Sequence, residues 1–195
     1  MKYYKVGEIR PSQIFFFFGV GANIDLFNLS VIVMGLGRWQ LGQADEIQES
    51  RLLKAIQKHR HYHQVKRLYA PPVLAAERSY NACDDENIQG IPVKVFPRWY
   101  RCSACHLIAP LESNLFELKT DCFHPDKTRY LHKTCSKAKS PTAIPLRFVV
   151  ACEHGHLNDF PWMEFVHKEK YCSSSGSLYL SIWRIICGDR SRSLL

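Results

Sequence analysis

The feature that most constrains the fold of this chain is a pair of cysteines, Cys102 and Cys105, in the segment "CSAC". A tight turn between two cysteines at this spacing points both sulfurs at one ion, and the amides of the turn can donate hydrogen bonds to them. One such pair supplies only half of a tetrahedral metal site. Two further ligands must therefore come from elsewhere in the sequence.

The missing ligands are expected from the cysteines that follow. Cys122 is the next cysteine after Cys105, and Cys135 is the one after that. The stretch between first and last cysteine is poor in long apolar runs, as in small folds that a metal holds together. The sequence therefore predicts an inserted, zinc-ribbon-like module over residues 100–140. Its zinc ion would be held by Cys102, Cys105, Cys122 and Cys135.

Other interpretations of these residues remain open. His124 or His132 could replace one of the thiolates, because imidazole is also a common zinc ligand. The cysteines could instead be half-buried free thiols that lie beside one another. A redox role for the "CSAC" pair is less favoured, because the thioredoxin-like βαβ context is missing.

A second group of reactive side chains follows in the segment "ACEHGHLNDFPW". Cys152, His154 and His156 alternate, so an extended strand would place them on one face, where they could hold a metal. Cys152 could also act as a nucleophile, with His156 as base and Asp159 as orienting group. Because Gly155 interrupts the strand, we expect instead that His156 and Asp159 brace the entry to a helix and that Cys152 lies in the core.

The positive charge of the chain is spread along the sequence. The formal charge is +8, and residues 1–99 and 100–195 each carry 13 Lys and Arg against 9 Asp and Glu. Two local stretches stand out: Lys54–Arg67, with no acid and three His, and Lys119–Arg147, with seven Lys or Arg against two Asp. Either could follow a phosphate backbone or be a solvated face. Trp99, between two nearby arginines, could stack on bases, but core packing is favoured.

Length and composition allow one ordinary domain with a small added module, since 46% of the 195 residues are apolar. We expect an N-terminal α+β region over residues 1–99, the zinc module over 100–140, and a strand–helix–strand closing region over 141–195. No secretory signal is visible, which favours a reducing, cytoplasmic location. The apolar stretch Ile14–Leu36 is interrupted by polar residues, including Asp25, so no membrane span is expected.

Local patterns predict the α+β class, with a small mixed sheet and a few short helices. Strands are expected at residues 13–18, 30–35, 91–102, 144–151 and 177–186. Helices are expected over residues 46–59, capped by Asp45, and over residues 156–170, capped by Asn158 or Asp159.

Four segments, taken in order, resemble the N-terminal region of the DrmB proteins of bacterial DISARM phage-defence systems. They are "VGEIRPSQ", "FFGVGANIDLFNLSVIVMGL", "GIPVKVFPRWYRCSAC" and "RFVVACEHGHLNDFPWMEFVH", and they span Val6–His167. The family pattern Cys-Glu-x-Gly-His-x-Asp-Asp-Phe-Pro-Trp falls on Cys152–Trp162. Asn158 replaces the first Asp of that pattern, which keeps a helix cap and loses a charge.

The resemblance implies a non-catalytic, DNA-associated antiviral defence protein that forms a complex with a superfamily-2 helicase subunit. Proteins of this family are normally several hundred residues long, so this chain is expected to be a fragment or a truncated version. Two alternatives stay open. One is a metal-dependent hydrolase or nuclease that uses Cys152, His156 and Asp159, and the other is a purely structural protein-interaction module.

Overall fold

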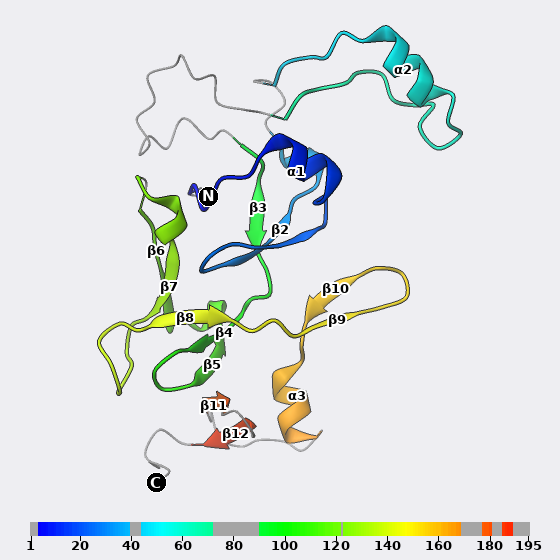
Figure 1. Cartoon of the computed structure of the whole chain (residues 1–195). Coiled ribbons are helices and arrows are strands. Elements are labelled where there is room, and N and C mark those ends of the chain that lie inside the picture. Colours follow the sequence, from blue (N-terminus) through cyan, green and yellow to red (C-terminus); the bar gives the residue numbers. More distant parts are fainter. Residues whose placement is uncertain are drawn as a thin grey trace. The chain divides into compact units, whose positions relative to one another are not determined.

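A computed structural model describes residues 4–39, 44–71, 90–121, 123–168, 177–180 and 185–188 of the chain (Figure 1). Within them the chain forms two compact units. One unit draws on residues 9–22 and 33–94, and the other on residues 4–8, 23–32 and those from 95 onward. Strands and a few short helices make up both, so the predicted α+β class is confirmed. The division into regions 1–99, 100–140 and 141–195 stays a prediction.

The first helix, α1 (Pro11–Phe16), lies where a strand was predicted, so that prediction was wrong. The run of aromatic residues favours a strand by propensity. However, proline suits the first helical turn, and the Gln13 side chain accepts a hydrogen bond from the amide of Arg10 at 3.0 Å. These local signals at the helix start outweigh the propensity of the following residues. Phe16 is left 82% exposed.

Helix α2 (Ser50–Gln57) lies inside the helix predicted over residues 46–59 but begins four residues later. The Glu49 side chain, not that of Asp45, caps it by accepting a hydrogen bond from the amide of Arg51 at 3.0 Å. Asp45 instead belongs to an extended segment, where its carbonyl accepts a hydrogen bond from the amide of Ala70 at 2.9 Å. The expected cap was therefore wrong, and the helix itself is confirmed in shorter form. In the described part of the chain, no helix is long and apolar enough to cross a bilayer.

A small sheet has the strand order β1 (Asn23–Asp25), β2 (Ser30–Val33) and β3 (Val93–Val95). The first two strands form an antiparallel hairpin, and β2 confirms the strand predicted at residues 30–35 in shorter form. Ile24 and Val31 lie opposite each other in this hairpin, and both are buried. The hairpin therefore contributes one apolar face to the core.

The largest sheet has seven strands in the order β12-β11-β5-β4-β8-β7-β6, and each of its six pairings is antiparallel (Figure 1). The sequence predicted a small mixed sheet, and it gave no strand order or register for that sheet. The strands are β4 (Trp99–Cys102), β5 (Leu107–Pro110), β6 (Phe116–Lys119), β7 (Arg129–His132), β8 (Thr142–Pro145), β11 (Ser177–Leu180) and β12 (Ile185–Gly188). Within the described ranges, three short 3-10 turns accompany the strands and helices, at Leu36–Arg38, Leu111–Ser113 and Pro125–Lys127.

Prolines divide two of the predicted strands. The strand expected at residues 91–102 is β3 followed by β4, with Pro97 between them. The strand expected at residues 144–151 is β8, which ends at Pro145, and a separate strand in another sheet. Proline has no amide hydrogen and cannot donate to a strand ladder, so a continuous strand would lose a hydrogen bond there. The strand expected at residues 177–186 is the hairpin of β11 and β12.

A two-stranded hairpin precedes the last helix. β9 (Val149–Ala151) pairs with β10 (Leu157–Asp159), and α3 (Trp162–His167) follows after Pro161. The helix predicted over residues 156–170 is therefore confirmed only over Trp162–His167, and residues 169–170 lie outside the described residues. Both of its predicted caps lie within β10, and that part of the prediction was wrong.

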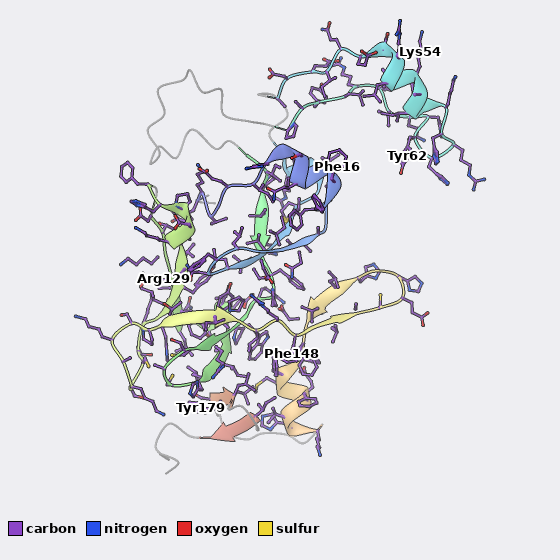
Figure 2. All side chains as sticks on the ribbon, in the orientation of Figure 1. Phe16, Lys54, Tyr62, Arg129, Phe148 and Tyr179 are labelled. Atoms are coloured by element: carbon purple, nitrogen blue, oxygen red, sulfur yellow. The ribbon has the colours of Figure 1, made fainter. Side chains whose placement is uncertain are left out.

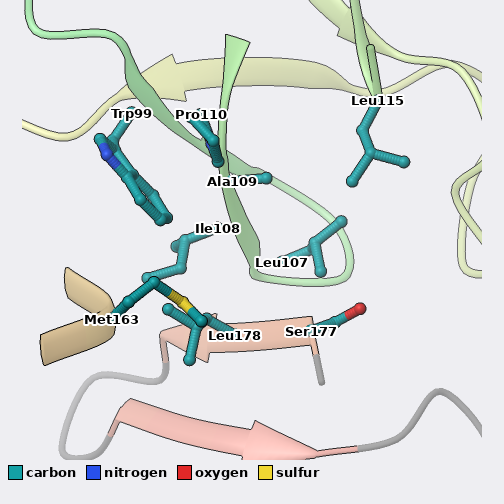
Figure 3. A pocket seen from close by; sticks show the side chains of 9 residues that line it. All are labelled: Trp99, Leu107, Ile108, Ala109, Pro110, Leu115, Met163, Ser177 and Leu178. Carbon is teal, nitrogen blue, oxygen red and sulfur yellow. The ribbon is translucent and has the colours of Figure 1, made fainter. Parts of the chain in front are cut away.

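One buried apolar cluster of the sheet unit forms where α3 meets the strands. Its buried centre consists of Ile108, Leu146, Trp162 and Leu178. Trp99 packs against this centre, as the preferred interpretation expected. Beside it lies a pocket of about 170 Å³ (Figure 3), lined by Trp99, Leu107, Ile108, Ala109, Pro110, Leu115, Met163, Ser177 and Leu178. None of these described lining residues has a titratable side chain.

Candidate metal centre

The sheet places four potential metal ligands at one end of neighbouring strands. Cys102 is the last residue of β4, and the turn of residues 103–105 brings the chain back to Cys105 and into β5. Cys102 pairs with Ala143 of β8, which in turn pairs with β7. His132 is the last residue of β7, and Cys135 follows three residues later. Strand register therefore brings together two segments that are far apart in the sequence.

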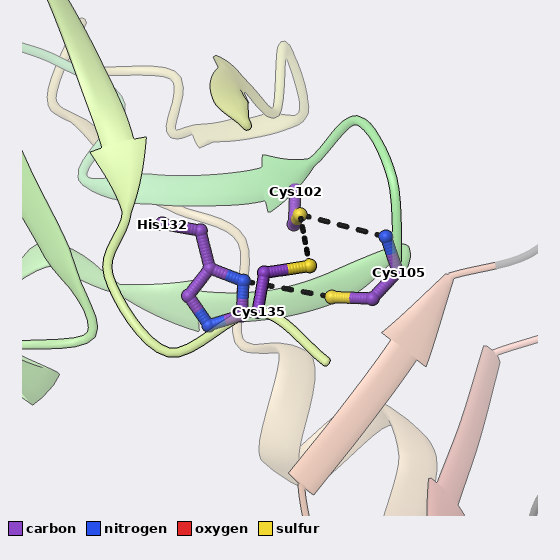
Figure 4. Close-up of side chains that lie close together, drawn as sticks. All are labelled: Cys102, Cys105, His132 and Cys135. Carbon is purple, nitrogen blue, oxygen red and sulfur yellow. Dashed lines mark hydrogen bonds between the residues drawn. The ribbon is translucent and has the colours of Figure 1, made fainter. Parts of the chain in front are cut away.

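The four side chains form one compact cluster (Figure 4). The potential ligand atoms of Cys102, Cys105, His132 and Cys135 all lie within 4.8 Å of one another. The Sγ atoms of Cys102 and Cys135 are 3.9 Å apart, and Cys105 Sγ is 3.5 Å from His132 Nδ1. Around tetrahedral zinc, with Zn–S of about 2.3 Å and Zn–N of about 2.0 Å, the corresponding separations are about 3.8 and about 3.5 Å. The residues present fit a zinc ion.

The four side chains are shielded from water, and a backbone amide contacts one of the sulfurs. Cys102 and His132 are 0% and 2% exposed, and the other two cysteines are partly buried. The amide of Cys105 donates to Cys102 Sγ at 3.5 Å, the kind of second contact that metal-bound thiolates receive. The cluster is therefore shielded from water and supplied with hydrogen-bond donors, as a structural metal centre requires.

The thiols differ in how readily they lose a proton. Burial raises the pKa of the Cys105 thiol to about 12, against the opposing effect of a hydrogen bond from the Leu107 amide. Burial acts in the same direction on Cys135, but hydrogen bonds from the amides of Lys137 and Ala138 outweigh it and lower the pKa of that thiol. A divalent cation would displace the protons, because thiolate is the form that binds metal.

The cluster contains three of the four predicted ligands, Cys102, Cys105 and Cys135. The fourth predicted ligand, Cys122, lies outside the described residues, and His132 is the fourth member of the cluster. His124, the other candidate substitute, lies elsewhere, with its Nδ1 3.3 Å from Asp121 Oδ2. A sequence signal for His132 existed, since His132-x-x-Cys135 repeats the two-residue spacing of Cys102-x-x-Cys105.

The second candidate group does not form a comparable cluster. Cys152 is exposed, not in the core as expected, and its Sγ lies 3.3 Å from His156 Nδ1 across the β9–β10 turn. His154 stacks loosely on His156, with ring centroids 6.5 Å apart. Among the described residues, the cluster of Cys102 is the one group of three or more such side chains close enough to share an ion.

Asp159 is engaged in an ion pair with Arg98. Its Oδ1 accepts a hydrogen bond from the Arg98 amide, and its Oδ2 accepts one from Arg98 Nε, both at 2.7 Å. The Asp159 side chain is only 7% exposed. The hydrogen bond to Asp159 raises the pKa of the Arg98 guanidinium, and exposed Glu112 at 3.0 Å adds to the effect. Asp159 therefore braces β10 against the start of β4, a partner that its sequence neighbours did not reveal.

Fold and site together define an antiparallel α+β protein with a candidate three-cysteine, one-histidine metal centre at the end of its main sheet. Residues 10–194 match the model of a family described as a domain of unknown function, DUF8724, and the chain belongs to this family. It is also similar to the DISARM protein DrmB of Bacillus paralicheniformis, with 32% identity over 92 residues. The match covers 46% of this chain and 15% of that protein, so the chain spans a small part of its relative's length.

Proposed function

We propose that this chain is a zinc-stabilised, non-catalytic accessory subunit of a DISARM-type phage-defence complex. In this role it contributes contacts to DNA, to a protein partner, or to both. The observation that carries the proposal is the cluster of Cys102, Cys105, His132 and Cys135, in a chain that is similar to a DISARM protein.

Zinc is the metal that this set of donors suits best. Three sulfurs and one imidazole nitrogen match the structural Cys₃His sites of zinc proteins, whereas magnesium and calcium prefer oxygen ligands. Catalytic zinc sites usually have three protein ligands and keep the fourth position open for water or substrate. Four protein donors converge here, and Cys102 and His132 are buried. A bound ion would cross-link the segments that carry its ligands. The closed set of four protein ligands therefore supports a structural role.

The proposed partner is a superfamily-2 helicase subunit, with DNA as the shared target and the cytoplasm as the location. The similarity to a DISARM protein and the ordered segments that resemble DrmB support this assignment. The matched part is small compared with the relative, so the chain would provide one module of the larger assembly.

An enzymatic function is a second candidate because of the contact between Cys152 and His156 at 3.3 Å. It is less favoured because Asp159, the expected orienting group, has both carboxylate oxygens bonded to Arg98. A nuclease that used these residues would lose DNA cleavage in the His156→Ala and Asp159→Asn variants while their folding remained intact.

The proposal is tested by the metal content and the partner binding of the purified chain. We expect close to one zinc per chain by inductively coupled plasma mass spectrometry, and most of it lost in Cys105→Ser. The matched control is Cys152→Ser, an exposed cysteine outside the cluster, which should retain full zinc content. The chain should also co-purify with the helicase subunit, and chelation should weaken that complex. Absence of zinc from the wild-type chain, or equal loss in both variants, would refute the metal site.

A further inference from the structure

Residues 45–70 form a hairpin that is closed by its own backbone hydrogen bonds, here called the basic hairpin. At its base, the amide of Ile47 donates to the carbonyl of Leu68 at 2.8 Å, and the amide of Ala70 donates to that of Asp45 at 2.9 Å. Farther along, Gln57 Nε2 donates to a backbone carbonyl of the returning segment at 2.8 Å. None of the side chains in this segment is buried. Its surface is therefore available for binding.

The basic hairpin contains a long stretch without any negative charge. No Asp or Glu occurs from Ser50 to Pro71, and the stretch holds the cations Arg51, Lys54, Lys58, Arg60, Lys66 and Arg67 together with three histidines. The acidic residues lie at the base, where Glu49 caps α2 and Glu46 lies 4.0 Å from Arg67. The positive charge is therefore concentrated on the helix and on the turn that follows it.

Helix α2 separates its basic and apolar side chains. Arg51, Lys54 and Lys58 are three and four residues apart, so they follow one another along one face on successive turns. Leu53 and Ile56 lie on the opposite face and are half-buried, while the three cations are exposed. This row of cations presents the pattern of charges that binds a phosphate backbone. Figure 2 labels Lys54 on this helix.

The turn after α2 adds aromatic rings to the charges. The rings of His59 and Tyr62 are stacked, with centroids 5.1 Å apart and planes at 28°, and His61 lies 5.6 Å from His59. Tyr62, which is labelled in Figure 2, remains 55% exposed, and Arg60 lies between these rings in the sequence. Exposed rings beside cations provide platforms on which unpaired bases can stack.

We propose that the basic hairpin binds single-stranded nucleic acid. The cations of α2 contact successive phosphates, and the turn, with Tyr62 as its most exposed aromatic ring, stacks against a base. This inference deepens the proposed function, because it assigns the DNA contact of the accessory subunit to a specific surface. It does not depend on the metal centre, since none of the four metal ligands belongs to the hairpin.

An unpaired strand fits this surface better than an anionic membrane does. Helix α2 has eight residues, and its apolar face carries aliphatic side chains that are partly covered, with no Trp or Phe to insert into lipid. The exposed aromatic rings lie in the basic turn instead, beside the charges. Fully paired duplex DNA would leave these rings without a base face to contact.

The test measures binding of the full-length chain to a labelled oligothymidylate by fluorescence anisotropy over a range of salt concentrations. Each phosphate contact to a single strand contributes about 0.7 to the slope of log affinity against log salt. The double variant Arg51→Gln/Lys54→Gln, at two exposed cations of α2, should therefore lower that slope by about 1.4. The matched control, Arg38→Gln/Lys94→Gln, makes the same change in net charge at exposed positions outside the hairpin and should leave the slope unchanged. Tyr62→Ala should weaken binding about tenfold, and Tyr62→Phe should stay within about twofold of wild type.

Four results would overturn the inference. An equal decrease of the salt slope in the hairpin double variant and in the control would show that positive charge acts without regard to its position. Binding to phosphatidylserine vesicles with none to the oligonucleotide would assign the hairpin to membranes. If wild type binds the strand and every hairpin variant binds it equally well, the hairpin assignment fails while the proposed function stands. If metal-loaded wild type binds no nucleic acid at all, the DNA contact in the proposed function fails with it.

Discussion

The two carboxylates that contact Arg98 provide a sharp test of how burial sets the strength of an ion pair. Asp159 is 7% exposed and accepts two hydrogen bonds at 2.7 Å, from the Arg98 amide and from Arg98 Nε. Glu112 is 58% exposed and accepts one hydrogen bond at 3.0 Å from the same guanidinium. The two variants Asp159→Asn and Glu112→Gln each remove one negative charge with almost no change in shape.

The expected costs follow from these contacts. A charge-assisted hydrogen bond contributes about 1.5 to 3 kcal/mol when buried. Asparagine at position 159 can still accept a hydrogen bond from the Arg98 amide. Its NH₂ group would face the Nε–H of Arg98, however, and two donors cannot form a hydrogen bond. Because the Arg98 side chain is 46% exposed, water can solvate part of its lost partner, and the cost is discounted accordingly. We therefore expect Asp159→Asn to lower the free energy of unfolding by about 2 kcal/mol and Glu112→Gln to lower it by less than about 0.5 kcal/mol.

Urea unfolding followed by far-UV circular dichroism measures both changes, provided that the slope of free energy against urea is the same in all three proteins. Zinc content should be checked in each variant, so that loss of metal is not counted as loss of the ion pair. The reasoning is refuted if the two variants are equally destabilised, or if Asp159→Asn costs less than about 0.5 kcal/mol.

Three further predictions concern the core and the metal centre. Trp162→Ala removes a side chain that is 3% exposed and should lower the free energy of unfolding by about 3 to 5 kcal/mol. Met163→Ala, at a position that is 40% exposed, should lower it by less than about 1 kcal/mol. Equal losses in urea unfolding would contradict the described core. In the metal-free chain at pH 8, iodoacetamide should modify Cys135 before Cys105. The pKa of Cys135 is lowered and that of Cys105 is raised to about 12, so Cys135 has the larger thiolate fraction. Peptide mass spectrometry gives the order of modification, and the reverse order would refute the prediction. Adding zinc to the metal-free chain at about 100 times its dissociation constant should raise the unfolding free energy by about 2.7 kcal/mol, and calorimetry should show no such gain with magnesium.

Short-range sequence signals located the elements of this fold better than they located the element boundaries. The helix at α2 and the strand at β2 were predicted because their apolar patterns are local. The predicted strand over residues 13–18 failed because Pro11 and Gln13 start a helix there. The prediction at residues 91–102 failed differently, because it carried a strand through Pro97, where the ladder must stop. The pairing of β11 with β5 depends on long-range contacts that no local pattern contains.

The metal site was predictable to the extent that it follows from spacing. The Cys102-x-x-Cys105 turn indicated two of the four ligands of the site, and Cys135 was expected as a third ligand. Choosing the fourth ligand from the sequence required knowing which segment lies beside the turn, and this depends on strand register. The register of β7 and β8 places His132 there. Asp159 shows the same limit, since its partner Arg98 lies 61 residues away in the sequence.

The position of the four candidate ligands also bears on how the chain matures. Cys135 is the last of them in the sequence, while β11 and β12, which complete the other edge of the same sheet, begin only at Ser177. An ion that binds as soon as Cys135 leaves the ribosome would close the loop that begins at Cys102 and restrict the nascent chain before its last strands exist. The strands β4, β5, β7 and β8 would then be held together before β11 and β12 are added to the sheet.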